Sequence, residues 1–510
     1  MLHVNSLCCF PISSRIEDTS AMDLVTIILS IILILLLVKI YYDQKPQYDD
    51  NYPPGPKPLP FIGNLHLILF RKRHCVFMKL SEEYGTVFSI KLGPAKMVIL
   101  CGFDTIKEAL INHAEEFSER PHVLTSRTSL SDGIVFAHGE NWKVIRKFTL
   151  SALRELGMGK RSIENKIQEE AQCLIQAIKS YKGEPFENMT IINAAVANII
   201  VFFLLDDRFE YDDPTLLKLI HHIHVTVRNI GSFMNRLYRM FPRLVGLLPG
   251  RHLKDVENME DMHALINKVF TEQRSTVDIN DPKNLIDAFR AKQQKAKPDH
   301  ISYFDNESLT MLVSDLFGAG MESTSATLRW GLLLMIKHPE IQQKVQNEIY
   351  RVIGSTEPQT EHRKQLPYTD AVIHEIQRFA DVVPLNVPHE TTNEVMIRGH
   401  YIPLGTIVFP MLTSALRDKD YFEKPYEFYP EHFLDSEGNF KKNEAFIPFS
   451  LGKRSCAGEN LAKMEIFLFF TSLLQNFTFQ APPRAKLNFT PASGFTNAPL
   501  PQKICAIPRS

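Results

Sequence analysis

The sequence has almost no net charge, because 57 Lys and Arg residues stand against 58 Asp and Glu residues among 510. A formal charge of −1 gives no support for a nucleic-acid partner, since such binding depends on concentrated positive charge. Hydrophobic residues make up 44% of the chain, which is enough for a large core. Length alone suggests two or three domains.

Paired cysteines of the metal-binding type are also missing. The seven cysteines are odd in number and scattered, with no C-x-x-C pair. This pattern argues against a disulfide framework and is typical of a reducing compartment. The residues are Cys8, Cys9, Cys75, Cys101, Cys173, Cys456 and Cys505.

Nucleotide-binding motifs are absent too. The run Gly157-Met-Gly-Lys160-Arg-Ser162 resembles part of a phosphate-binding loop but lacks a hydroxyl residue directly after the lysine. No G-x-G-x-x-G follows a predicted strand. If the chemistry uses electrons from NADPH, another protein must therefore carry the nicotinamide and flavin sites.

Near the N-terminus, Leu24 to Val38 is an apolar run without charge, extended past Lys39 by residues 40–42. The total of about 19 residues is close to what a bilayer requires, which predicts an uncleaved membrane anchor. A cleaved signal peptide is disfavoured because Arg15 is offset by acidic residues and no A-x-A site follows. A buried core helix is disfavoured because the run is apolar on every face.

Basic residues after this run, including Lys39, Lys45 and the group at 71–73, predict a cytoplasmic location for the rest of the chain. We then expect the N-x-S/T sequons at Asn188, Asn306, Asn476 and Asn488 to be unused. The predicted division is an N-terminal extension (1–20), a transmembrane anchor (21–42), a proline-rich hinge (43–60) and one catalytic domain (61–510).

The hinge carries the run Pro53 to Pro60, which favours extended geometry and indicates a stiff spacer rather than a flexible linker or an SH3 ligand. After it, residues 87–92 and 97–101 are predicted strands, and strands after residue 390 are short. The fold class is mostly α with small β-sheets. Helices are predicted at 104–113, 140–156, 161–181, 189–205, 214–238, 252–275, 307–336, 339–353, 369–379 and from 459.

The segment from Phe449 to Gly458 places Cys456 just before the predicted helix that starts at residue 459. A helix N-terminus favours a thiolate, Gly452 permits a tight turn, and Gly458 lets a flat group approach the backbone. Arg454 suits a carboxylate. The alternative is a buried structural thiol at the start of a core helix.

The pattern F-x-x-G-x-R-x-C-x-G resembles in full the haem-ligand signature of the cytochrome P450 family. The resemblance extends over nearly the whole chain after residue 50 and is greatest to the vertebrate microsomal, drug- and lipid-oxidising branch (family-two-like). It implies the cytochrome P450 fold and haem b, with Cys456 as the axial iron ligand and with Phe449 and Gly458 beside the haem. It also implies NADPH–cytochrome P450 reductase as a partner, with cytochrome b5 as a second candidate.

Trp142 and Arg146 lie at i and i+4 on one predicted helix face. Alone, this spacing fits an ordinary amphipathic helix equally well. The resemblance implies that they contact the haem propionates together with Arg120, His389 and Arg454.

The helix at 307–336 contains two glycines followed by Glu322, Ser323 and Thr324. The glycines are compatible with a helix–helix contact or with a local opening that admits dioxygen. The resemblance implies that the acid and hydroxyls relay protons, but Ser323 stands where the family usually has threonine. Serine lacks the methyl group that stiffens χ1, so we expect a leakier relay.

Glu375 and Arg378 form an E-x-x-R pair, which alone predicts only a surface ion pair. The resemblance implies that they are buried with His432 and hold the cysteine loop. It also implies an apolar substrate pocket that includes Val135, Phe136, Phe317, Ala319, Gly320, Val383, Val387 and Phe495.

Two surface interpretations remain open. The apolar, turn-rich run at 241–249 is either a membrane contact or a buried turn. The basic residues are either a docking face for an acidic reductase or plain solvated charge. They are Lys143, Arg146, Lys147, Lys441, Lys442, Lys453 and Lys463.

These features together predict a haem-thiolate monooxygenase in the endoplasmic reticulum membrane. Its substrates are lipophilic: fatty acids, steroids or xenobiotics. The main alternative is a reductase-independent isomerase or dehydratase of lipid peroxides. A cysteine hydrolase using Cys456 and a haem-binding sensor are two further alternatives.

Overall fold

The structure is a computed structural model. It describes residues 16–43, 51–69, 72–93, 95–121, 133–159, 161–230, 232–240, 245–271, 281–295, 303–492 and 494–509. Most of the predicted N-terminal extension lies outside these ranges.

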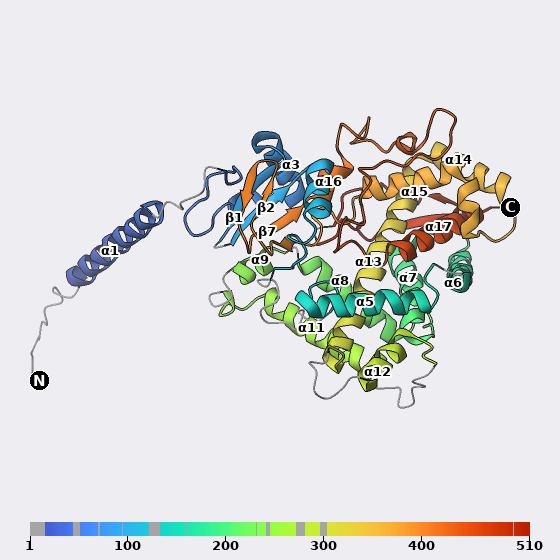
Figure 1. Cartoon of the computed structure of the whole chain (residues 1–510), viewed down its shortest axis with the longest axis horizontal. Coiled ribbons are helices and arrows are strands. Elements are labelled where there is room, and N and C mark those ends of the chain that lie inside the picture. Colours follow the sequence, from blue (N-terminus) through green and yellow to red (C-terminus); the bar gives the residue numbers. More distant parts are fainter. Residues whose placement is uncertain are drawn as a thin grey trace, which may run out of the picture.

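Helix α1 (Ile16–Asp43) stands apart from the rest of the chain in Figure 1. It covers the predicted anchor, and its apolar side chains from Leu24 to Leu37 are exposed. Helix α7 (Asn188–Leu205) is also long and apolar enough to cross a membrane, but 83% of it is buried inside the protein. The two helices therefore differ in what covers their apolar surface: α7 is covered by the core, whereas nothing in the described protein covers α1.

Four strands form the largest sheet, in the order β1 (Val87–Leu92), β2 (Ala95–Leu100), β7 (Ile407–Pro410) and β4 (His389–Glu390). β2 pairs antiparallel with β1 and parallel with β7, so segments more than 300 residues apart share one sheet. β4 pairs with β7, which places His389 opposite Val408. β4 is an edge strand of this sheet, but His389 lies in the interior of the protein, where it is 2% exposed.

Two smaller sheets complete the β structure. One has the order β3 (Phe186–Glu187), β9 (Lys503–Pro508), β8 (Phe477–Gln480). The other is a hairpin of β5 (Val395–Ile397) and β6 (His400–Ile402). Arg398 and Gly399 both have positive φ, the backbone geometry that a two-residue hairpin turn requires.

Helices make up most of the remaining structure, which confirms the predicted class. The shorter ones are α2 (Leu65–Ile68), α3 (Arg73–Tyr84), α4 (Phe103–Lys107), η1 (Glu108–Asn112), η3 (Asn267–Thr271), η4 (Thr360–Gln365), α16 (Leu412–Leu416) and η5 (Pro430–Phe433). The longer ones are α5 (Gly139–Glu155), α6 (Arg161–Lys179), α8 (Pro214–Ile230), α9 (Phe233–Met240), α11 (Arg251–Ile266), α12 (Leu285–Lys295), α13 (Asn306–Lys337), α14 (Pro339–Val352), α15 (Pro367–Ala380) and α17 (Glu459–Asn476).

Two helix predictions differ from the structure, and some helices were missed. The helix predicted at 214–238 is two helices, because Gly231 and Ser232 are poor helix formers and α8 ends at Ile230. α11 ends at Ile266 and continues as the short π-helix η3. The helices α3 and α12 were not predicted.

The centre of the molecule is α13, which packs against α7, α15 and α17 (Figure 1). Gly320 allows α13 to approach α7 closely, because a Cβ at this position would lie 2.6 Å from Ile200 Cδ1. Asp305 caps the helix by accepting a hydrogen bond from Ser308 N at 2.7 Å. α13 thus packs against α17, the helix that directly follows the Cys456 loop.

Candidate cofactor site around Cys456

A closed loop presents Cys456 directly before α17. The Cys456 N–H donates to Phe449 O at 3.0 Å, and the Ser455 N–H donates to Gly452 O at 3.2 Å. Gly452 has a φ of +74°, and a Cβ there would lie 2.0 Å from the Leu110 carbonyl oxygen. Only glycine fits this position without moving the backbone.

The thiol of Cys456 is accessible, yet burial among surrounding atoms is the main influence that raises its pKa. The Gly458 N–H and Arg146 act to lower the pKa, but Glu459 and burial outweigh them. The contribution of the Gly458 N–H, at the start of α17, is in the direction that the helix N-terminus predicts, although the net shift of the pKa is upward. Coordination to a metal deprotonates a cysteine ligand outright, so the thiolate would come with the cofactor.

Three guanidinium groups approach the site from separate parts of the chain. Arg120 is buried and donates to the carbonyl oxygens of Val135, Val387 and Pro388 at 2.8–3.2 Å. Burial lowers the pKa of Arg120, and the charges of Arg454 and Arg146 lower it further. Burial also lowers the pKa of Arg454, to about 9. This mutual repulsion makes the site favourable for an anion.

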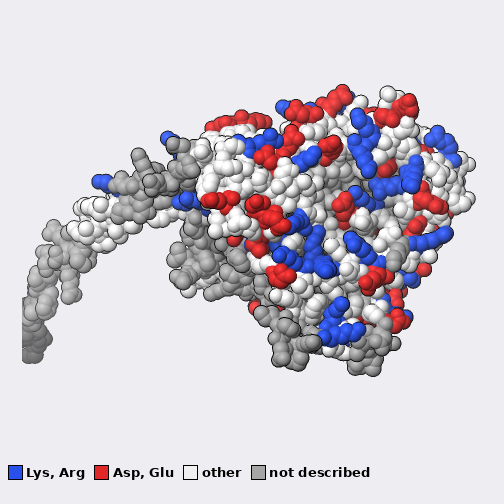
Figure 2. All heavy atoms as spheres, in the orientation of Figure 1, with Lys and Arg blue, Asp and Glu red and all other residues white. Residues whose placement is uncertain are grey.

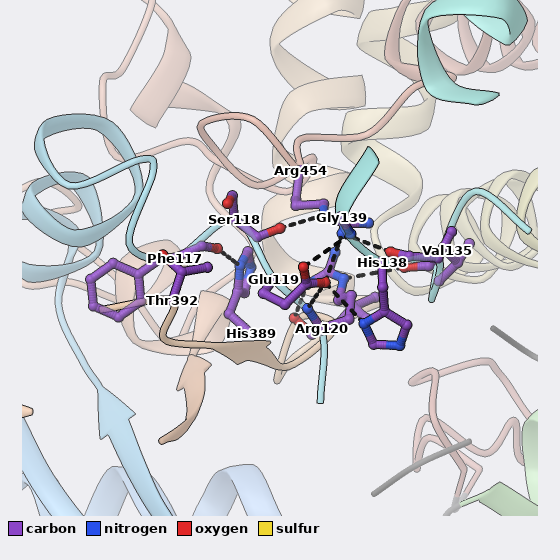
Figure 3. A network of polar contacts seen from close by, with 12 residues as sticks. Phe117, Ser118, Glu119, Arg120, Val135, His138, Gly139, His389, Thr392 and Arg454 are labelled. Atoms are coloured by element: carbon purple, nitrogen blue, oxygen red, sulfur yellow. Dashed lines mark hydrogen bonds and ion pairs between the residues drawn. The ribbon is translucent and has the colours of Figure 1, made fainter. Parts of the chain in front are cut away.

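One carboxylate, Glu119, lies within this cluster and was not among the predicted site residues (Figure 3). It accepts hydrogen bonds from the backbone N–H groups of Arg120 and Gly139, pairs with His138 Nδ1 at 2.9 Å, and lies 3.5 Å from Arg454 Nη2. Burial acts to raise the pKa of Glu119, but these partners hold it below its usual value. In the sequence, this carboxylate could have been found as the acidic residue directly before Arg120.

Three buried nitrogen atoms around the cluster have no hydrogen-bond partner among the described residues: Trp142 Nε1, His389 Nε2 and Arg454 Nη1. They come from α5, from β4 and from the cysteine loop. The other nitrogen of His389 pairs with Phe117 O at 2.6 Å, and Arg454 also donates to Ser118 O and Ala137 O (Figure 3). A buried donor without an acceptor costs about 1–3 kcal/mol. Such donors on two elements, α5 and the cysteine loop, fit a ligand that brings carboxylates. His389 Nε2 is an acceptor in the neutral ring, because Nδ1 donates its hydrogen to Phe117 O and burial lowers the pKa of the ring well below its usual value.

A haem meets these requirements. Its two propionates would accept from the unpartnered donors and offset the positive charge of the arginines, and its iron would bind the accessible thiol. The Cβ direction of Gly458 is open, with no atom within 4 Å, which leaves room for a flat group. Another predicted propionate contact, Arg146, donates to Ser455 O at 2.6 Å and so also supports the loop.

The predicted acid and hydroxyls on α13 point in different directions, because successive residues are 100° apart around a helix. Glu322 is buried and accepts from Thr496 Oγ1 at 3.1 Å. Ser323 is partly exposed and donates to Ala319 O at 2.7 Å, whereas Thr324 is buried. α13 is continuous through Gly318 and Gly320, so the structure lacks the local opening that the glycines could have provided.

The predicted pocket residues fall into two groups. Ala319 is exposed, and Val135, Phe136, Val383, Val387 and Phe495 are partly exposed. Phe317, by contrast, is fully buried beside Phe270, and Gly320 faces Ile200 of α7.

Asp315, which was not predicted as a site residue, fixes the 134–135 loop by accepting from both backbone N–H groups at 2.8 and 2.9 Å.

The E-x-x-R pair is fully buried. Arg378 donates to both carboxylate oxygens of Glu375, at 2.7 and 2.6 Å, and to the carbonyl oxygens of Leu416, Pro425 and Glu427. His432 Nδ1 lies 3.2 Å from Glu375 Oε2. These contacts connect α15 to η5 and to the segment that leads to the cysteine loop.

Comparisons with known proteins agree with this site. The family model described as "Cytochrome P450" matches residues 53–506. The chain is 43% identical to cytochrome P450 2B2 of Rattus norvegicus, over 92% of this chain and 96% of that one. It is 42% identical to cytochrome P450 2B4 of Oryctolagus cuniculus over 92% and 96%, and 41% identical to cytochrome P450 2G1 of the same species over 95% and 99%.

Proposed function

Because this chain belongs to the cytochrome P450 family, we propose that it is a membrane-bound monooxygenase of lipophilic compounds with a separate NADPH-dependent reductase as electron donor. Family membership makes the chain a haem-dependent oxidoreductase that incorporates oxygen from O₂. Fatty acids, steroids and xenobiotics are the proposed substrate classes.

The bound haem b supplies the iron at which O₂ is activated. We assign Cys456 as the axial ligand, since its thiol is the accessible one in the loop that closes onto α17. Trp142 and Arg454 would hold the propionates with their unpartnered donors, and His389 would join them from Nε2 when a propionate draws a second proton onto its ring. Arg120 and Arg146 would supply further positive charge, while Phe449 and Gly458 would flank the macrocycle.

Protons would reach the reaction through α13. The hydroxyl of Ser323 lies on the same accessible side of the helix as Ala319, one turn earlier. Glu322 is the acid that would supply protons to this hydroxyl, either by reorienting its side chain or through a water molecule. Thr324 would provide a second hydroxyl. The partly exposed apolar side chains of Val135, Phe136, Val383, Val387 and Phe495 would bind the substrate largely through buried area.

The membrane would contact one end of the molecule. Exposed apolar side chains occur in two places: at the end of the hinge and just after it, and around the start of α11. Figure 1 shows α9 beside β1 at the end that faces α1, and Leu237 of α9 packs with the β1 cluster. Residues 241–244 of the proposed contact lie outside the described ranges. The exposed residues are Leu59, Phe61, Ile62, Leu247, Leu248 and Leu253.

The reductase would bind the basic side chains near the cysteine loop, with cytochrome b5 as a second partner. Lys143, Lys147 and Lys453 are exposed, and Figure 2 shows basic groups gathered on the face that carries α5, with acidic groups among them. Lys143 pairs with Glu140 and Lys453 with Glu115, so part of this charge is already neutralised. We place the catalytic part on the cytoplasmic side of the endoplasmic reticulum membrane.

The observation that carries the proposal is the pair of unpartnered donors, Trp142 Nε1 and Arg454 Nη1, within an arginine cluster beside an accessible cysteine. The test is reconstitution of the full chain in vesicles with reductase, NADPH, ¹⁸O₂ and a lipophilic probe. We expect one labelled oxygen atom in the product and no product without reductase. Conversion of a lipid hydroperoxide without NADPH would instead support the isomerase or dehydratase alternative.

A further inference from the structure

The buried carboxylate of Glu322 faces a histidine from another helix. His224 Nδ1 on α8 lies 3.8 Å from Glu322 Oε2, within ion-pair reach but beyond a hydrogen bond. Both atoms are buried, and neither has a hydrogen-bond partner. A small rotation of either side chain would therefore bring Nδ1 and Oε2 within hydrogen-bond distance and satisfy two buried groups at once.

His224 also reaches accessible surface. Its side chain is 26% exposed, and of its two ring nitrogens only Nδ1 is buried without a partner. The exposed part of the ring is therefore on the Nε2 side. Glu322, by comparison, is 5% exposed. The imidazole thus lies between water and the buried acid, which is the arrangement a proton shuttle needs.

The other neighbours of Glu322 cannot play this part. Thr496 Oγ1 donates to Oε1, the opposite carboxylate oxygen, and Thr496 is itself buried. Arg329, on the same helix, is close enough for Glu322 to raise its pKa, but burial lowers that pKa to about 10, so it stays protonated near neutral pH. The charge of Glu187 also acts to raise the pKa of Arg329. Among these groups, the imidazole is the one that combines accessible surface with a ring nitrogen facing the acid.

We propose that His224 is a positioning and relay residue, which orients Glu322 and passes protons to it from solvent on the α8 side. The proposal rests on the role of Glu322 in the proposed function. A proton from water binds Nε2, and the resulting imidazolium releases its Nδ1 proton to Glu322 Oε2. One proton enters at Nε2 and one leaves from Nδ1, and a flip of the neutral ring then turns its remaining N–H toward Glu322 for the next transfer.

Coupling provides the functional test. His224→Gln keeps a polar side chain but cannot carry a proton, so hydrogen peroxide released per NADPH should rise and product formation should fall roughly tenfold, less than the ~10²–10⁴ of a direct general acid. The matched control is His222→Gln, two residues away, whose ring pairs with Asn258 Oδ1 at 2.8 Å and so faces α11. We expect wild-type coupling from this control.

The double variant separates the two proposals. If His224 acts through Glu322, then Glu322→Gln/His224→Gln should match Glu322→Gln alone in peroxide per NADPH. Uncoupling by Glu322→Gln with normal coupling in His224→Gln would overturn the relay and leave the proposed function intact. Normal coupling in Glu322→Gln would instead reject the role of Glu322, and the relay with it.

Accessibility can be tested without turnover. Diethyl pyrocarbonate acylates accessible neutral imidazole nitrogens, and peptide mass spectrometry of the folded holoprotein locates the adducts. We expect an adduct on His224 and none on His252, which is 1% exposed with both ring nitrogens buried. An unlabelled His224 under conditions that label exposed histidines would contradict a path from solvent through this ring.

Discussion

The guanidinium carbon of Arg454 lies 3.8 Å from the centre of the Trp142 ring. Each of these side chains carries one buried donor without a partner, Nη1 and Nε1 respectively. The cation–π contact fixes the relative orientation of the two groups, so their donors are preorganised before any ligand binds. α5 and the cysteine loop, more than 300 residues apart, thus form one binding surface.

Trp142→Phe keeps an aromatic ring under Arg454 and removes the N–H together with the five-membered ring that carries it. The holoprotein would lose a hydrogen bond to a charged group, worth about 1.5–3 kcal/mol, so haem should dissociate to a scavenging globin roughly 10- to 150-fold faster. Trp330→Phe is the control, because Trp330 Nε1 donates to Asn497 O rather than to a ligand. Equal haem loss from both variants would show that Nε1 of Trp142 does not hold the cofactor.

Glu375→Ala should remove about 3–5 kcal/mol of stability, because it leaves Arg378 as a buried charge without its partner. We expect little or no haem incorporation and a low thermal midpoint. The comparison is Glu431→Ala, an exposed acid beside His432, which should change stability by less than about 0.5 kcal/mol. A Glu375→Ala protein that binds haem normally would contradict a structural role for the pair.

The sequence predicted much of the fold where the signal was local. The strand at 87–92 and helices such as those over α7, α13 and α14 follow from hydrophobic patterning and capping. The position of Cys456 before α17 followed from ten residues. The break between α8 and α9 was missed because apolar periodicity continues across Gly231 and Ser232.

Contacts between distant segments could not be predicted in this way. Glu119 and Arg454 are 335 residues apart, and Thr496 and Glu322 are 174 apart. Nothing in the local pattern around either acid specifies its partner, because the pairing is set by how the helices pack. The pKa of the Cys456 thiol likewise depends on burial by tertiary packing, which acts against the local helix terminus.

Ser323→Thr tests the departure from the family pattern. The added methyl group restricts χ1, so the hydroxyl should hold its position more often. We expect more product and less peroxide per NADPH than in the wild type. Unchanged coupling would reject the idea that serine makes the proton relay leakier.

Asp381 predicts a pH dependence of stability. Burial raises its pKa to about 7, against a hydrogen bond from Thr413 at 2.6 Å that acts to lower it. Because the folded state holds the proton more tightly than the unfolded state, this contribution to stability is full below pH 4 and is lost as the pH rises toward 7.

The matched variant is Asp381→Asn, which keeps a hydrogen-bonding side chain and suits the left-handed backbone at this position. Its stability should fall less between pH 5 and pH 8 than that of the wild type. The upper limit of the difference is on the order of 4 kcal/mol, from about three pKa units. Parallel pH profiles of the thermal midpoints would contradict this assignment.

The carbon monoxide difference spectrum of the reduced, purified protein tests the central claim most directly. A cysteine thiolate on haem iron should give a strongly red-shifted Soret band, and Cys456→Ser should abolish that band. Cys505→Ser, at a buried cysteine in β9, should leave the band in place. Folded wild-type protein that shows no such band, or a band that survives Cys456→Ser, would contradict the assignment of Cys456 as the haem ligand.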